Sequence, residues 1–177
     1  MQPLSSEQAL FLLQDTYLPA LKNEQRITTK VIEAVPLDKG HYRPDPVSRT
    51  ALELAWHIAA AENRFLETTI NGEFNTSASA RPESVRNSAD VAAWYAERFE
   101  KNLDGLTKLR SEQLLKVVDF RGIFQRPAVT FLQLAMMHSI HHRGQLSTYL
   151  RPMGAKVPSI YGESYDDAQA RKAAQAS

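Results

Sequence analysis

The chain has 177 residues, of which 43% are hydrophobic, a length and composition that suit one domain with a well-buried core. Its 21 Lys and Arg nearly balance its 20 Asp and Glu, so the net charge of +1 provides no large field to attract nucleic acid or an anionic membrane. Cysteine is absent, which excludes disulfides, thiolate ligands and cysteine nucleophiles, and neither a signal-peptide pattern nor a long apolar run occurs, so we expect a cytoplasmic protein.

Apolar residues recur with helical spacing from Ser5 to Val35, which predicts a long first helix. Ser5 is the predicted N-cap, because Gln8 follows it three residues later, as in a capping box. Pro19 lies inside the pattern, where it removes a backbone donor and clashes with the preceding turn. We therefore expect either a kink at Pro19 or two abutting helices.

Two further helices follow, each after a polar connection. The loop over residues 36–47 is rich in Pro and Gly and leads to Ser48, the predicted N-cap of a second helix from about Thr50 to Ile70. Residues 73–87 are too polar and irregular for a core element and are interpreted as a long crossover. A third helix is predicted from its N-cap Ser88 to near Arg110.

The last third of the chain predicts a hairpin, a helix and a tail. Two short runs flank Arg121-Gly122, which indicates a short β-hairpin, and a fourth helix is predicted from about Thr130 to Leu150. Four long helices with long crossover connections favour an all-α four-helix bundle over residues 1–162. Residues 163–177 are interpreted as a polar C-terminal tail.

Two of the five histidines have a spacing that suits a metal site. His138 and His142 are four residues apart, so on an α-helix both imidazoles project from one face, one turn apart. They share a stripe with Phe131 and Leu134, which predicts that both face the bundle interior, where a polar group without a partner is costly. The alternative is that each imidazole forms a hydrogen bond with a carbonyl in the core.

His57 is the leading candidate for a third ligand. It lies near the middle of the second predicted helix, at a depth that can match His138 and His142, and bundles build metal sites from facing helices. Taken alone, His57 would more often be a core histidine with a hydrogen-bond partner. His41 lies in a loop and His141 lies off the stripe, so neither is assigned as a ligand.

Three other residues are candidates for catalytic or supporting roles. Gln145 and Tyr149 continue the stripe of His142 at i+3 and i+7, where they would contact a ligand imidazole or a substrate; packing at the helix end is the alternative. Glu53 lies one turn before His57 and is the nearest carboxylate on that face. It is a candidate general base or histidine partner, with a solvated surface glutamate as the alternative.

The run His138-Ser139-Ile140-His141-His142-Arg143-Gly144-Gln145 is followed by Leu-Ser-Thr-Tyr-Leu-Arg and then by a Gly and a Pro. Together with Trp56-His57-Ile58 and the Pro-rich loop before it, this run resembles the DinB-like superfamily of small bacterial four-helix proteins, over about residues 5 to 162. The resemblance implies an up-down-down-up bundle, usually a homodimer, with a divalent metal held by His57, His138 and His142. Related branches include bacillithiol S-transferases and mycothiol-dependent maleylpyruvate isomerases, while many members have no assigned reaction.

Three neutral imidazoles leave an open coordination position, which is typical of a catalytic rather than a structural site. The main hypothesis is an enzyme that uses a divalent ion, with zinc or nickel as first choices, to activate a thiol or water. It would be a thiol-dependent transferase or isomerase, or a hydrolase, and would act on a small molecule. A low-molecular-weight thiol would supply the thiol group that the chain, which has no cysteine, lacks. The alternative is a non-catalytic, dimeric metal-binding or stress-associated bundle. We expect no nucleic acid or membrane partner.

Overall fold

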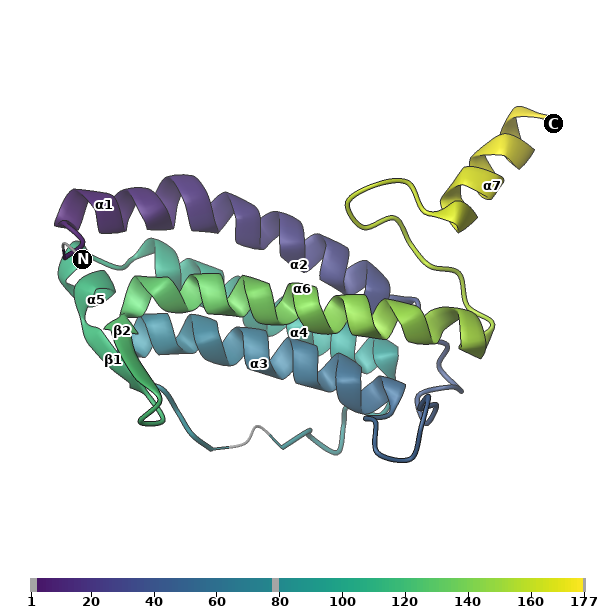
Figure 1. Cartoon of the computed structure of the whole chain (residues 1–177), viewed down its shortest axis with the longest axis horizontal. Helices are drawn as coiled ribbons and strands as arrows, with labels where there is room; N and C mark the ends of the chain where they lie inside the picture. Colours follow the sequence, from purple (N-terminus) through teal and green to yellow (C-terminus); the bar gives the residue numbers. More distant parts are fainter. Residues whose placement is uncertain (1–2, 78–79, 177) are drawn as a thin grey trace.

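The computed structural model describes residues 3–77 and 80–176, and in that part of the chain four long helical segments pack side by side (Figure 1). They are a first segment of α1 (Ser6–Phe11), a π-helical turn (Leu12–Tyr17) and α2 (Leu18–Glu33), followed by α3 (Ala51–Asn71), α4 (Ser88–Thr107) and α6 (Phe131–Leu150). The helices α2 and α6 run in one direction and α3 and α4 in the other (Figure 1). Both α2 and α3 pack against α4 and α6, so α2 and α3 are diagonal in the bundle. The predicted all-α bundle is confirmed, with the up-down-down-up order.

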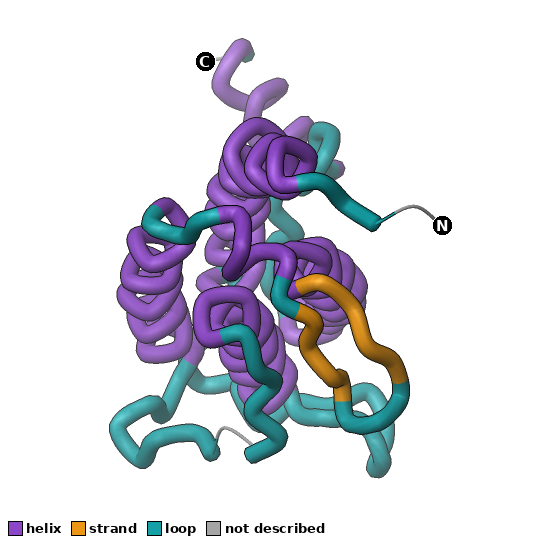
Figure 2. Tube along the Cα trace, turned by 90° about the vertical axis from the view of Figure 1, so that its left-hand side faces the viewer, coloured by secondary structure: helices purple, strands orange, loops and turns teal. Residues whose placement is uncertain are grey.

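The predicted hairpin is also confirmed. After the short helix α5 (Ser111–Leu115), strands β1 (Val117–Phe120) and β2 (Phe124–Pro127) pair antiparallel. Figure 2 shows the pair beside one end of the bundle. Arg121 and Gly122 both have positive φ angles, of 58° and 72°, which is the backbone of a tight hairpin turn. A 3-10 turn (Ala128–Thr130) then leads directly into α6.

The first helix continues through Pro19 and does not divide there into two abutting helices. The turn before it is π-helical, and the amide of Leu18 donates to the carbonyl of Leu13, five residues back instead of four. In a regular α-helix the proline ring would clash with the carbonyl four residues earlier. The wider turn accommodates this ring, so α1 and α2 form one continuous segment.

Two helices begin at a different cap from the one that the sequence suggested. The N-cap of α3 is Thr50, not Ser48: the Thr50 hydroxyl accepts from the amide of Glu53, and the Glu53 carboxylate accepts from the Thr50 amide at 2.8 Å. The N-cap of α4 is Asn87, not Ser88. Ser88 is buried, and its hydroxyl donates to the carbonyl of Val35, just after the end of α2.

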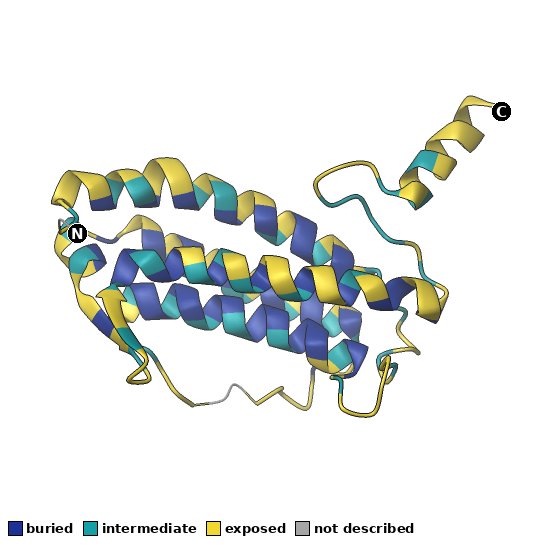
Figure 3. Ribbon diagram, viewed as in Figure 1, coloured by how far each residue is buried: buried dark blue, intermediate teal, exposed yellow. Residues whose placement is uncertain are grey.

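The core lies between the four long helices, whose inner faces are buried while their outer faces are exposed (Figure 3). The polar tail contains a further helix that the sequence analysis did not assign, α7 (Tyr165–Gln175), which projects beyond the bundle and buries none of its residues. It is joined to the preceding segment by Asp166, whose carboxylate accepts from the amide of Val157 at 2.8 Å. Among the described residues, no helix combines the length and apolar character needed to cross a bilayer.

Candidate metal centre

The three histidines meet at the seam between α3 and α6, the pair of helices with the most extensive contact. His57 comes from α3, and His138 and His142 come from α6; all three are half-buried. The prediction that the α6 pair faces the interior was wrong in part, because the buried face of α6 is centred on neighbouring positions, among them Ser139 and Arg143. The i, i+4 spacing fixes a shared face but not its angle to the core.

The imidazole Nε2 atoms of the three histidines converge. His57 Nε2 lies 3.0 Å from His138 Nε2 and 3.2 Å from His142 Nε2, and all three atoms lie within 4.8 Å of one another. A tetrahedral ion with metal–nitrogen bonds of 2.0–2.1 Å requires nitrogen atoms about 3.3 Å apart. The two shorter separations are close to that value, so this group can hold a divalent metal ion.

Hydrogen bonding among the histidines cannot satisfy this arrangement. A neutral imidazole carries one proton, so His57 Nε2 can donate to one neighbour but not to both. Among the described residues, no backbone carbonyl accepts from any of the three Nε2 atoms, which disfavours the core-carbonyl alternative. A cation would engage all three lone pairs at once.

The other ring nitrogens differ in their partners. His142 Nδ1 lies 3.1 Å from the side-chain oxygen of Gln145, and a proton donated there leaves the Nε2 lone pair facing the other histidines. The Nδ1 atom of His138 is buried and has no hydrogen-bond partner among the described residues. Gln145 is therefore the one sequence candidate that contacts the triad directly.

The surroundings keep the triad neutral. Burial, with a contribution from the Arg49 guanidinium, lowers the pKa of His57 to about 4, and burial with the neighbouring His142 lowers the pKa of His138 to about 3. Burial also lowers the pKa of His142, against an opposing effect of the hydrogen bond to Gln145. At neutral pH all three Nε2 atoms can thus act as metal ligands.

The remaining candidates lie away from the triad or are engaged elsewhere. The Glu53 carboxylate accepts from the amide and the hydroxyl of Thr50, so it serves the N-cap of α3. Tyr149 is buried, with its ring against Tyr42. His41 is exposed and outside the group, and the exposed His141 packs its ring against His142 without joining the triad.

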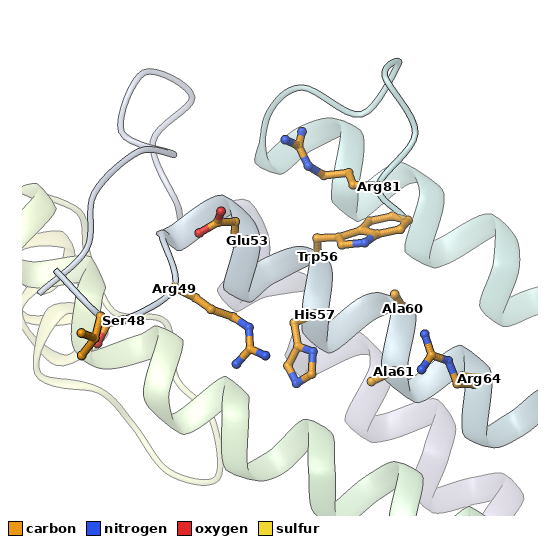
Figure 4. Close-up of a pocket in the computed structure, with 10 residues that line it drawn as sticks. Ser48, Arg49, Glu53, Trp56, His57, Ala60, Ala61, Arg64 and Arg81 are labelled. Atoms are coloured by element: carbon orange, nitrogen blue, oxygen red, sulfur yellow. The ribbon is translucent and has the colours of Figure 1, made fainter. Parts of the chain in front are cut away.

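A pocket of about 610 Å³ opens beside His57 (Figure 4). Its lining includes Trp56, Ala60, Ala61 and three arginines that the sequence analysis did not single out, Arg49, Arg64 and Arg81. Arg64 follows His57 by seven residues, two helical turns, so helical spacing alone could have placed it on the same face. Arg49 and Arg81 come from connecting segments, where no periodicity reveals which surface a side chain faces.

Arg143, which directly follows His142, belongs to a buried hydrogen-bond network and not to the triad. Its guanidinium is buried in the core, 2.7 Å from the carboxylate of Glu24, and it also donates to Thr28 and to the hydroxyl of Tyr161. Tyr161 in turn donates to Glu24 at 2.8 Å. This network ties α6 to α2 and to the segment before α7.

Glu62 of α3 is a second buried polar group. One carboxylate oxygen accepts from the hydroxyls of Tyr95, at 2.7 Å, and of Ser139, while the other has no partner among the described residues. Burial raises the pKa of Glu62 to about 7, against the opposing effect of these two hydrogen bonds. Ser139 directly follows His138 on α6 and is buried, so the Glu62 carboxyl lies at the α3–α6 interface on its core side.

Comparison with known proteins gives one consistent result. A family model described as DinB family matches residues 7–175, which extends beyond the expected limit near residue 162. The uncharacterized protein YjoA of Bacillus subtilis (strain 168) is 31% identical over 134 residues, 75% of this chain and 85% of that protein. The uncharacterized protein YrdA of the same organism is 26% identical over 160 residues, 89% of this chain and 93% of that protein.

Solved structures agree with this result. The crystal structure of the DinB-like protein YjoA matches with a TM-score of 0.66 at 26% identity, covering 83% of this chain and 97% of that one. A DinB-like protein from Bacillus cereus ATCC 10987 matches in fold with a TM-score of 0.70 at 24% identity, covering 84% and 97%. Because the family model matches nearly the whole length of this chain, the chain belongs to the DinB family.

Proposed function

We propose that the protein is a divalent-metal-dependent enzyme in which His57, His138 and His142 hold the ion, with zinc or nickel as first choices. A divalent ion bound there would lower the pKa of a thiol or a water molecule and so supply a nucleophile at neutral pH. The observation that carries the proposal is the convergence of three neutral Nε2 atoms beside a pocket large enough for a small molecule.

The chain's own residues support this role in three ways. Burial keeps the imidazoles neutral, and Gln145 orients the ring of His142. The small side chains of Ala60 and Ala61 leave room beside His57. Three protein ligands leave a coordination position for a substrate atom, as in catalytic rather than closed structural sites.

The reaction class that we propose is a thiol-dependent transfer or isomerisation, with hydrolysis as the water-dependent counterpart. A low-molecular-weight thiol would bring the sulfur, because the chain contains no cysteine. The resemblance to thiol-dependent branches of the superfamily supports this choice. We also propose a homodimer, which sedimentation at several protein concentrations would test.

Metal content is the first test. Protein purified without an affinity tag is expected to contain about one divalent ion per chain, measured by elemental analysis. His142→Ala should lose the ion, whereas the adjacent His141→Ala, which alters an exposed ring outside the triad, should retain it. Wild-type protein that neither contains nor takes up a divalent ion would refute the proposal.

Reactivity is the second test. Metal-loaded protein is screened with thiol cofactors against electrophilic substrates, with His142→Ala as the matched inactive control. Turnover that needs both the triad and the thiol supports the proposed class. Tight metal binding with no turnover, combined with a collapse of thermal stability in His142→Ala, would instead favour the non-catalytic, stress-associated bundle.

A further inference from the structure

The pocket beside His57 is cationic. Among the described residues that line it, Arg49, Arg64 and Arg81 carry positive charge, and Glu53 carries the opposing carboxylate. Arginine presents a planar fork of donors that matches the two oxygens of a carboxylate or phosphate. The lining therefore favours a ligand with a negative group.

Glu53 and Arg81 both form hydrogen bonds with groups outside the triad. One oxygen of the Glu53 carboxylate, Oε2, accepts from the Thr50 amide at 2.8 Å and from the Thr50 hydroxyl at 2.9 Å, so the carboxylate is held at the start of α3, one helical turn before His57. Arg81 lies above Trp56, and its guanidinium donates to the carbonyl of Val85 (Figure 4).

Arg49 is the arginine that reaches the triad. Its side chain extends toward His57 in Figure 4, and no ion-pair partner is recorded for it within residues 3–77 and 80–176. Arg49 and His57 line the same pocket, and the Nε2 atom of His57 lies 3.0 Å and 3.2 Å from those of His138 and His142. The guanidinium therefore lies on the side of the pocket where the triad opens.

A guanidinium next to a divalent ion is unfavourable unless an anion lies between them. Two like charges at short range in a partly desolvated site repel each other, and an anion bound between them adds an attractive interaction with each, which offsets that repulsion. Among the described residues that line the pocket, Glu53 is the one carboxylate, and its hydrogen bonds to Thr50 hold it at the N-cap of α3. A ligand is the natural source.

We propose that the pocket binds a small molecule that carries an oxyanion, a carboxylate or a phosphate, which Arg49 holds while the reactive thiol or hydroxyl of the same molecule faces His57, His138 and His142. This inference rests on the proposed function and specifies its substrate class. Arg64 and Arg81 add positive potential that draws the anion into the pocket.

The test measures binding rather than turnover. Protein loaded with cobalt(II) in place of the native ion is titrated with 3-mercaptopropionate, with its uncharged methyl ester and with 2-mercaptoethyl phosphate, and each affinity is read from the absorption spectrum of the cobalt. In the wild type, at least one of the two anions should bind more than about tenfold more tightly than the ester. The comparison of 3-mercaptopropionate with the phosphate identifies which oxyanion the pocket prefers.

Variants then assign the effect to one residue. Arg49→Gln should weaken the binding of the preferred anion by about tenfold or more and leave the affinity of the ester unchanged. Arg26→Gln, which alters an exposed arginine on the diagonal helix α2, should change neither. Equal affinities of the wild type for anions and ester, or an equal loss for both in Arg49→Gln, would overturn the inference.

Failure of the proposed function is distinguished from failure of this inference. If the wild type takes up no cobalt, the proposed function fails, and the anion site is tested alone in the metal-free protein. Succinate and inorganic phosphate are then titrated while the nitrogen-15 signals of the arginine side chains are followed. A saturable shift that disappears in Arg49→Gln supports the anion site, and the absence of any such shift refutes it.

Discussion

The guanidinium of Arg143 lies 2.7 Å from the carboxylate of Glu24, and only 1% of the Arg143 side chain is exposed. This pair crosses the core from α6 to α2, and both charges are taken out of water. A buried ion pair is costly to break, because removing one partner leaves the other charge uncompensated. The arginine directly after His142 therefore serves the bundle rather than the metal site.

Replacing Arg143 with Met should lower the free energy of unfolding by about 3–5 kcal/mol, measured by urea denaturation. The loss comes mainly from the stranded carboxylate, so adding Glu24→Leu should recover most of it. If the double variant is as unstable as Arg143→Met, the remaining donor contacts to Thr28 and Tyr161, and not the ion pair, determine stability here.

Replacing Gln145 with Leu should weaken metal binding by about 10–100-fold, because the Nδ1 proton of His142 loses the acceptor that fixes the ring. Competition with a chelator of known affinity measures the change. Gln133→Leu, at an exposed position of the same helix, is the matched control and should have no effect. Equal metal affinity in both variants would show that the Gln145 contact does not orient the ligand.

The stability of the metal-free protein should fall as the pH drops from 7 toward 4. The pKa values of His57 and His138, about 4 and about 3, lie below the ordinary value of 6.5, so in this range the unfolded chain binds more protons than the folded one. The contribution of the neutral histidines to the free energy of unfolding is thus fully present above pH 6.5 and is lost on acidification. Urea midpoints measured across this range should show a smaller slope in a His57→Gln/His138→Gln variant. An unchanged slope would contradict the assignment.

Glu62 should act in the opposite direction. Its pKa of about 7 lies above the ordinary value of 4.5, so the folded protein keeps a proton that the unfolded chain releases, and stability falls as the pH rises from 4.5 through 7. At pH 8, Glu62→Gln should therefore be more stable than the wild type by roughly 1–3 kcal/mol, with no gain at pH 4.5. The exposed Glu97→Gln on α4 serves as control. A gain that is independent of pH would refute a role for the charge.

Periodicity predicted the elements that bury a continuous apolar face. The four long helices and the seam position of His57 opposite His138 follow from spacing, since a residue in mid-helix can meet its partners across a bundle. The hairpin followed from Arg121-Gly122, whose positive φ angles the turn requires. These features are set by local sequence and by the need to bury one face.

Features that depend on three-dimensional context were missed. The cap of α3 is an exception, because Glu53 three residues after Thr50 completes a capping box that the sequence itself contains, whereas Ser48 has no such partner. The helix α7 has no buried face, so its sequence shows no apolar periodicity and was interpreted as a polar tail. Arg49 precedes α3 in a connecting segment, and nothing in the order of residues shows that its side chain reaches the triad.

His57 and His138 are 81 residues apart in the chain, yet their Nε2 atoms lie 3.0 Å apart. An ion that joined them would close a loop of that length, as a disulfide does in proteins that can form one, and would restrict the unfolded chain in a similar way. In a chain without cysteine, the triad can thus act as a removable cross-link between α3 and α6. The folded state would then tighten or relax with the supply of a divalent ion rather than with the redox state of its surroundings.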